Sequence, residues 1–172
     1  AVLNSIDNVN VALMRFNGNA GGPVLKGMTP LDTGRAEILD TISNIFEGGS
    51  TPLSETLYEA ALYWRGLPAY YGNIVNEHTT DPAALASTNP EVYQQPAFDP
   101  CAKNYNVVLT DGAPTEDLEA AGLVDSLPGW FQTMGHAGCI GAANGDCLDD
   151  IAEYLYNHDI APTVPGVQTV IN

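Results

Sequence analysis

The chain has 172 residues, of which 45 % are apolar, so it is long enough for one buried core and too short for two. Charged residues make up 15 %, and 21 Asp and Glu face five Lys and Arg, which gives a net charge of -16. Such a surface repels phosphate backbones and anionic membranes, so nucleic-acid binding is excluded and cations are the expected partners. No apolar run approaches the roughly 20 residues of a membrane span. Because the chain opens like the end of a helix and closes inside a predicted strand, we expect a piece of a longer protein.

The first third predicts two strands and a helix. Residues 9–16 are mostly apolar and run into an Asn/Gly-rich turn at 17–22, which is typical of a strand followed by a loop. A short second strand is expected at 22–25, where Pro23 would confine it to a sheet edge. Apolar residues at helical spacing predict a helix over 35–46, capped by residues 32–34.

A second helix is predicted directly after the Gly-Gly-Ser-Thr-Pro break at 48–52. Its apolar stripe consists of Leu53, Leu57, Ala60, Ala61 and Trp64. Residues 66–100 carry five of the twelve prolines without a clear period, so they are expected to form a surface insertion rather than a layer of the core. Aromatic residues cluster nearby, and packing of this insertion onto the helix is favoured over an exposed partner-binding patch. They are Tyr58, Tyr63, Trp64, Tyr70 and Tyr71.

The last third predicts further strands alternating with helices. Residues 104–110 are expected to form a central parallel strand with residues 107–109 as its buried centre. A helix over 117–127, a loop over 128–146, a helix capped by Asp146 and a strand at 167–171 follow. This alternation predicts an α/β fold with a mostly parallel central sheet, helices on both faces, and a single domain over residues 1–172.

The three cysteines suggest an oxidising compartment. Cys139 and Cys147 bracket a Gly/Asn-rich loop that is short enough to close as a disulfide, which leaves Cys101 over. Three reduced thiols in a cytosolic domain are the alternative. A zinc site is disfavoured because no CxxC occurs and His78, His136 and His158 lack finger spacing. The histidines are expected in exposed loops or at helix ends.

Two oxygen ligands stand at the ends of predicted elements. Asp111 follows the predicted central strand, and Thr51 precedes the second helix. Such strand ends meet at the binding crevice of open α/β sheets, so the pair suggests a hard cation such as Mg²⁺ or Ca²⁺. The alternatives are an ordinary helix cap at Thr51 and an ordinary turn at Asp111.

Six segments, in order along the chain, resemble the von Willebrand factor A domain of the PilC/PilY family of pilus-tip proteins. They are MRFNGN at 14–19, GSTPLSETLYEA at 49–60, CAKNY at 101–105, LTDGAPT at 109–115, CLDDIAEYL at 147–155 and GVQTV at 166–170. The resemblance implies a Rossmann-like A domain of a secreted protein at a type IV pilus tip or base. It further implies roles in adhesion and assembly, without catalysis, through pilins or minor pilins and a host or surface ligand.

The resemblance also implies a metal-ion-dependent adhesion site to which Thr51 and Asp111 would contribute. The Asp-x-Ser-x-Ser loop of that site is not in this chain, so the family's first strand and first helix are expected upstream. Binding of Mg²⁺, Mn²⁺ or Ca²⁺ by these 172 residues is therefore expected to be weak or absent. The alternatives are a purely structural surface domain and, less favoured, a phosphotransferase with Asp111 as nucleophile, which lacks the second Asp of such loops and a downstream Lys.

Overall fold

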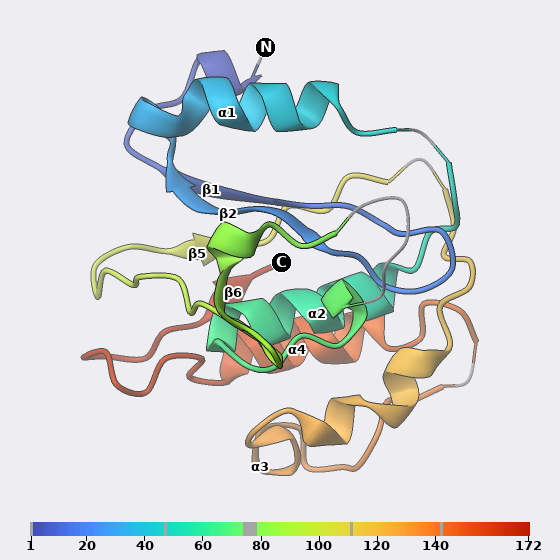
Figure 1. The fold of residues 1–172 in the computed structure, drawn as a ribbon. Coiled ribbons are helices and arrows are strands. Elements are labelled where there is room, and N and C mark those ends of the chain that lie inside the picture. The colour runs from blue at the N-terminus through green and yellow to red at the C-terminus, as the bar shows by residue number, and fades with distance from the viewer. Residues whose placement is uncertain (1, 47, 74–78, 111, 142) are drawn as a thin grey trace.

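After the short 3-10 turn η1 (Val2–Asn4), the chain forms a β-hairpin that leads directly into a helix. The computed structural model describes residues 2–46, 48–73, 79–110, 112–141 and 143–172 (Figure 1). Strands β1 (Asn10–Met14) and β2 (Val24–Pro30) pair antiparallel with an irregular register, and helix α1 (Leu31–Ser43) starts at the next residue. The second strand is therefore longer than predicted, and α1 begins four residues earlier. Leu31 and Ile38 are fully buried, which fixes the inner face of this helix.

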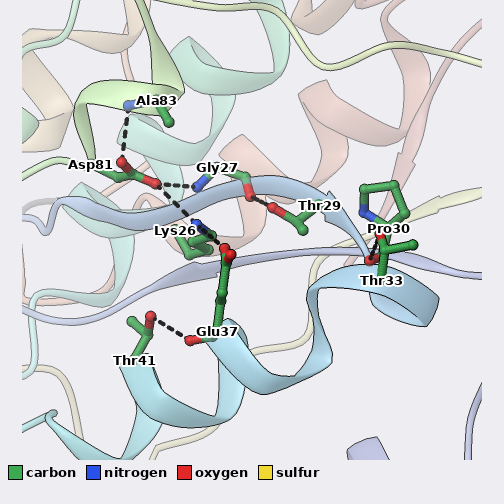
Figure 2. Close-up of polar contacts among 9 residues, drawn as sticks. All are labelled: Lys26, Gly27, Thr29, Pro30, Thr33, Glu37, Thr41, Asp81 and Ala83. Carbon is green, nitrogen blue, oxygen red and sulfur yellow. Dashed lines mark hydrogen bonds and ion pairs between the residues drawn. The ribbon is translucent and has the colours of Figure 1, made fainter.

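One polar cluster ties β2 to the elements on either side of it (Figure 2). Lys26 Nζ lies 2.8 Å from the carboxylate of Glu37 on α1 and 4.0 Å from that of Asp81. Asp81 also accepts hydrogen bonds from the backbone N–H groups of Gly27 and Ala83. The Asp81 carboxylate thus links the hairpin to the turn η3 (Pro82–Ala84).

Helix α2 (Leu53–Arg65) is the centre of the core. The sequence predicted one apolar stripe, but every residue from Leu53 to Trp64 is buried. The helix stops at Gly66, whose positive φ of 64° is the left-handed conformation that ends many helices. Helix α4 (Leu148–Asn157) packs along α2, and the short α3 (Trp130–Met134) packs on α4 (Figure 1).

The prediction that residues 66–100 stay outside the core is wrong. This segment contains η2 (Tyr71–Asn73), η3 and a hairpin of β3 (Leu85–Thr88) and β4 (Glu91–Tyr93). It supplies four buried side chains to the core, namely Ala69, Tyr71, Ala84 and Tyr93. The preferred reading of the aromatic cluster is confirmed, because rings of this segment lie edge-on against rings of α2: Tyr70 and Tyr71 on Tyr58, and Tyr93 on Tyr63.

The predicted α/β fold with a mostly parallel central sheet is also wrong. Among the described residues the strands form three separate two-stranded sheets, β1–β2, β3–β4 and β5–β6. Of these described strands, only β5 (Asn104–Tyr105) and β6 (Val170–Ile171) are parallel, over two residue pairs. The reason is that residues 107–109 gain no strand partner among the described residues, so the apolar run predicted as the sheet centre stays outside the core. The core instead forms around α2.

Two further expectations fail in the C-terminal third. Residues 117–127 form the 3-10 turns η4 (Glu119–Gly122) and η5 (Val124–Ser126) rather than an α-helix. Asp146 does not cap α4, whose N-cap is Cys147, because the Asp146 carboxylate accepts a hydrogen bond from Ala143 N–H within its own loop. Across the described parts of the chain, no helix combines the length and apolar character needed to cross a membrane.

Candidate functional site

The start of α2 is capped by a residue that lies far away in the sequence. Pro52 at the N-cap offers no side-chain hydrogen bond, and Asp117 fills that role from the loop after residue 112. The two carboxylate oxygens of Asp117 accept hydrogen bonds from the backbone N–H groups of Ser54 (2.9 Å) and Glu55 (3.0 Å). A buried negative charge is stabilised there because the first N–H groups of a helix lack internal partners and carry positive partial charge.

Glu55 holds two loops against this end of α2. Its side chain is 1 % exposed and accepts hydrogen bonds from Gly21 N–H (2.8 Å) and Glu119 N–H (3.1 Å). Gly21 has a φ of 48°, and a Cβ there would lie 2.3 Å from the Tyr71 ring, so the close approach requires glycine. Burial raises the pKa of Glu55 above its ordinary value, against the lowering effect of the two backbone donors.

Glu59 lies one turn further along α2 and organises the 70–72 turn. Its carboxylate, fully buried, accepts hydrogen bonds from the backbone N–H groups of Tyr71 (2.8 Å), Gly72 (3.0 Å) and Tyr70 (3.1 Å). The hydroxyl of Tyr93 is a fourth donor. Burial raises the pKa of Glu59, although all four donors favour the ionised form. Glu59 is thus a structural acceptor for backbone groups that would otherwise be buried unpaired.

Thr51 lies beside the loop that follows Asp111. The Thr51 N–H donates to the Thr115 hydroxyl (3.0 Å), and the Thr115 N–H donates to the Thr51 carbonyl (3.1 Å). The Thr115 loop therefore contacts Thr51, although not at the edge of a parallel sheet as predicted. Asp111 itself lies outside the described residues, so the structure does not place the second predicted metal ligand.

The described residues around Thr51 do not fit a preformed metal site. No group of three or more His, Cys, Asp or Glu side chains with metal-binding geometry occurs within the described ranges. Asp117, at the start of α2, uses each of its carboxylate oxygens to accept a hydrogen bond from a backbone N–H group. The residues described at this site offer only Thr51 as a predicted oxygen ligand.

A buried amide stands at the end of β1. Asn17 is fully buried, and neither polar atom of its side chain has a hydrogen-bond partner among the described residues. The Ser54 hydroxyl is likewise fully buried and lacks a partner there. Buried polar groups of this kind are commonly satisfied by an internal water, which needs two to four polar partners.

The cysteine pairing predicted from the sequence is confirmed, while the histidines are only partly as expected. Cys139 and Cys147 form a disulfide with Cα atoms 5.2 Å apart, and Cys101 is free and exposed. His158 does lie at the end of α4, but it is half-buried, stacks on Tyr154 and pairs with the Thr133 hydroxyl at 2.8 Å. Burial lowers its pKa. His136 is half-buried in a loop, and His78 lies outside the described residues.

An exposed apolar stripe continues the short strand β5. Tyr105, Val107 and Leu109 are 55 %, 80 % and 84 % exposed, and Val108 between them is 46 % exposed. No backbone–backbone hydrogen bond joins residues 107–109 to any other described residue. Figure 1 shows the chain leaving β5 without entering a helix. This stripe is the largest departure from the sequence prediction, which made the same residues the buried centre of a sheet.

Sequence reasoning missed Glu55, Glu59, Asp117 and Asn17. One signal was available for the two glutamates: they stand four residues apart in a helix whose other residues are mostly apolar, with no Lys or Arg four residues from either of them. Nothing local marks Asp117 or Asn17, because their surroundings are set by loops far away in the sequence.

Comparison with known proteins identifies no relative: no family model, no curated protein and no solved structure matches this chain.

Proposed function

We propose that this chain is a non-catalytic binding and assembly module of an exported, pilus-associated surface protein of PilY type. The observation that carries the proposal is the Cys139–Cys147 disulfide, in a chain whose ordered motifs resemble that family. Structural disulfides persist in oxidising compartments and are rare in the cytosol, so this bond supports export. The proposal covers function and location only, since the central parallel sheet expected of an A domain is not found among the described residues.

The chemistry of the described residues supports binding rather than catalysis. The carboxylates of Glu55 and Glu59 are buried and accept hydrogen bonds from backbone N–H groups, which is a structural role. The exposed stripe of Tyr105, Val107 and Leu109 is a surface of the kind that marks protein contacts. Pilins or minor pilins are the proposed partners on one side, and a host or surface ligand is the proposed partner on the other.

A divalent cation is not required for this function as proposed. Thr51 and Asp111 are the residues that would contact Mg²⁺, Mn²⁺ or Ca²⁺, and two side chains leave most of the six or more positions of such an ion to water. Any cation is therefore expected to bind weakly to these 172 residues.

The proposal is tested by binding of the whole chain to purified pilin and minor-pilin subunits of the organism that carries it. The chain is immobilised with its disulfide intact, and binding is measured by biolayer interferometry beside an unrelated protein of equal negative charge. Saturable binding to a pilin but not to the control supports the proposal, and equal signals on both surfaces contradict it.

A phosphatase assay tests the absence of catalysis. With Mg²⁺ and a general phosphomonoester substrate, turnover should not exceed that of a heat-treated sample. Turnover that disappears in the Asp111→Asn variant would establish the phosphotransferase alternative instead.

A further inference from the structure

We propose that the groove between residues 100–104 and 167–171 binds an uncharged sugar ring. This inference deepens the proposed function by naming the chemistry of the host or surface ligand, and it rests on that function only for its biological setting.

The groove lies where the paired strands β5 and β6 meet the last turn of α4. Its volume of about 400 Å³ falls within the roughly 300–1,000 Å³ of ordinary small-ligand sites. The residues that line it come from the approach to β5, from the approach to β6 and from Tyr156 on α4. The Asn104 amide donates to the Thr169 carbonyl (3.1 Å) across the groove lining, and α4 packs on β6. The lining is therefore assembled by the fold from segments that are far apart in the sequence.

Gln168 is a buried polar side chain of this lining with an unused acceptor. It is 3 % exposed, and its Nε2 donates to the Pro165 carbonyl (3.3 Å), while its backbone N–H donates to the Asp159 carboxylate (3.1 Å). No described residue donates to Gln168 Oε1, and this oxygen is not sealed inside the core, so it is open to the groove. A polar atom of a buried side chain needs a partner, and here a ligand or water must supply the donor.

Asn104 and Lys103 add a second acceptor and a set of donors. The Asn104 NH₂ group is used on Thr169, whereas Asn104 Oδ1 accepts no hydrogen bond from the described residues. Lys103 lines the groove, and no carboxylate or carbonyl of the described residues engages its ammonium group, which carries three N–H donors. The groove thus offers amide oxygens that accept and an ammonium group that donates.

This mixture of donors and acceptors selects a polyhydroxylated ligand. A hydroxyl both donates and accepts, so neighbouring hydroxyls of a sugar can satisfy the amide oxygens and Lys103 together. A carboxylate or phosphate only accepts, and it would leave both amide oxygens unpaired while meeting the repulsion of a chain with a net charge of -16. A cation would be repelled by Lys103. An uncharged ligand with several hydroxyls avoids all of these costs.

Tyr156 supplies the apolar surface that a sugar ring needs. Its side chain is 59 % exposed in the last turn of α4 and offers a flat face with a polar hydroxyl at its end. The C–H face of a pyranose can cover this ring and remove apolar area from water. An extended peptide would instead pair with free backbone N–H and C=O groups, whereas the recognition groups here belong to side chains around an aromatic ring. A sugar is therefore favoured over a peptide.

The test is saturation-transfer NMR of the whole chain with its disulfide intact. The probes are the methyl glycosides of glucose, galactose, mannose and N-acetylglucosamine, beside methyl glucuronide as an acidic sugar and an uncharged Gly/Ser/Thr peptide. We expect saturable binding of at least one of the four uncharged glycosides, and weaker binding of the glucuronide and the peptide. No saturable binding of any uncharged glycoside would overturn the proposal, as would equal or tighter binding of the glucuronide or the peptide.

Three variants locate the site. Tyr156→Ala removes the ring from the groove, and Phe131→Ala is its matched control, because Phe131 is 61 % exposed on α3 and is not among the residues that line the groove. Lys103→Met keeps the stem and removes the donors. All three side chains are exposed, so circular dichroism should show folded variants. Tyr156→Ala should weaken glycoside binding at least tenfold, Lys103→Met at least threefold and Phe131→Ala less than twofold. Equal effects of Tyr156→Ala and Phe131→Ala would place the sugar elsewhere and overturn the proposal.

The two proposals fail separately. Pilin binding without glycoside binding would keep the proposed function and remove the sugar site. Glycoside binding that Tyr156→Ala abolishes, in a chain that binds no pilin, would keep the sugar site and remove the assembly role.

Discussion

Replacing Glu59 by Gln should destabilise the fold by removing one acceptor from a buried cluster of donors. One carboxylate oxygen of Glu59 accepts from Gly72 N–H, and the other accepts from Tyr71 N–H. Glutamine has the same shape but a single oxygen, so in either orientation its NH₂ group faces one of these N–H groups. Leaving one buried donor unpaired costs about 1–3 kcal/mol.

The assay is equilibrium urea unfolding at neutral pH, read by the circular dichroism of the helices. We expect Glu59→Gln to lower the free energy of unfolding by about 1–3 kcal/mol. Glu153→Gln is the matched control, because it makes the same change on an exposed position of α4 and should alter the free energy by less than about 0.5 kcal/mol. Hydrogen exchange should show faster exchange at Tyr71 or Gly72 in the Glu59 variant.

Glu59→Gln could also leave the stability unchanged or raise it, because the cost of burying the Glu59 charge opposes the stabilisation from its hydrogen bonds. Desolvation disfavours an ionised carboxylate with no basic partner, and glutamine removes that cost. If Glu59→Gln were as stable as the unmodified chain or more stable, the desolvation cost would outweigh the backbone pairing. The account of Glu59 as a structural acceptor would then be wrong.

Three further outcomes are expected. Burial raises the pKa of Glu59 in the folded state, so the stability that Glu59 contributes should be fully present below its ordinary pKa of 4.5 and should be lost as the pH rises through the raised pKa. The free energy of unfolding of the unmodified chain, taken relative to that of Glu59→Gln, should therefore fall with rising pH in urea titrations, and a difference that does not change with pH would contradict this. Reducing the Cys139–Cys147 disulfide should lower the free energy of unfolding by about 2–3 kcal/mol, because the bond closes a short loop. Thermal unfolding with and without reductant measures this change. An unchanged melting temperature would mean that the loop is equally ordered without the bond. Calorimetric titration with Mg²⁺ should give a millimolar or weaker dissociation constant, which corresponds to a binding free energy of about 4 kcal/mol or less. Thr51→Ala should weaken the binding further. Micromolar affinity would contradict the assignment of Thr51 and Asp111 as ligands.

Local sequence signals determined several elements correctly. Residues 53–65 form a helix because Pro52 at the N-cap, the helical spacing of the apolar residues and Gly66 at the C-cap are all local signals. The same holds for β1, for α4 and for the Cys139–Cys147 pair, whose short loop limits the distance that it must close. In each case the interactions that decide the outcome lie within a few residues of one another.

Contacts between distant segments decided the rest. An apolar run such as 107–109 forms a buried strand only if other strands flank it. Among the described residues, the pairing with β6 ends at Asn106, and residues 107–109 have no flanking strand. Glu55 and Glu59 look like solvent-facing residues in the sequence, yet the loops at 20–22, 70–72 and 115–119 close over them and donate their N–H groups. Asp117 caps a helix that begins more than 60 residues earlier. The sequence by itself thus sets which segments are helical or extended, because local hydrogen bonding and the spacing of apolar residues suffice for that. The burial of charged side chains and the exposure of apolar ones depend instead on which distant segment packs against each element.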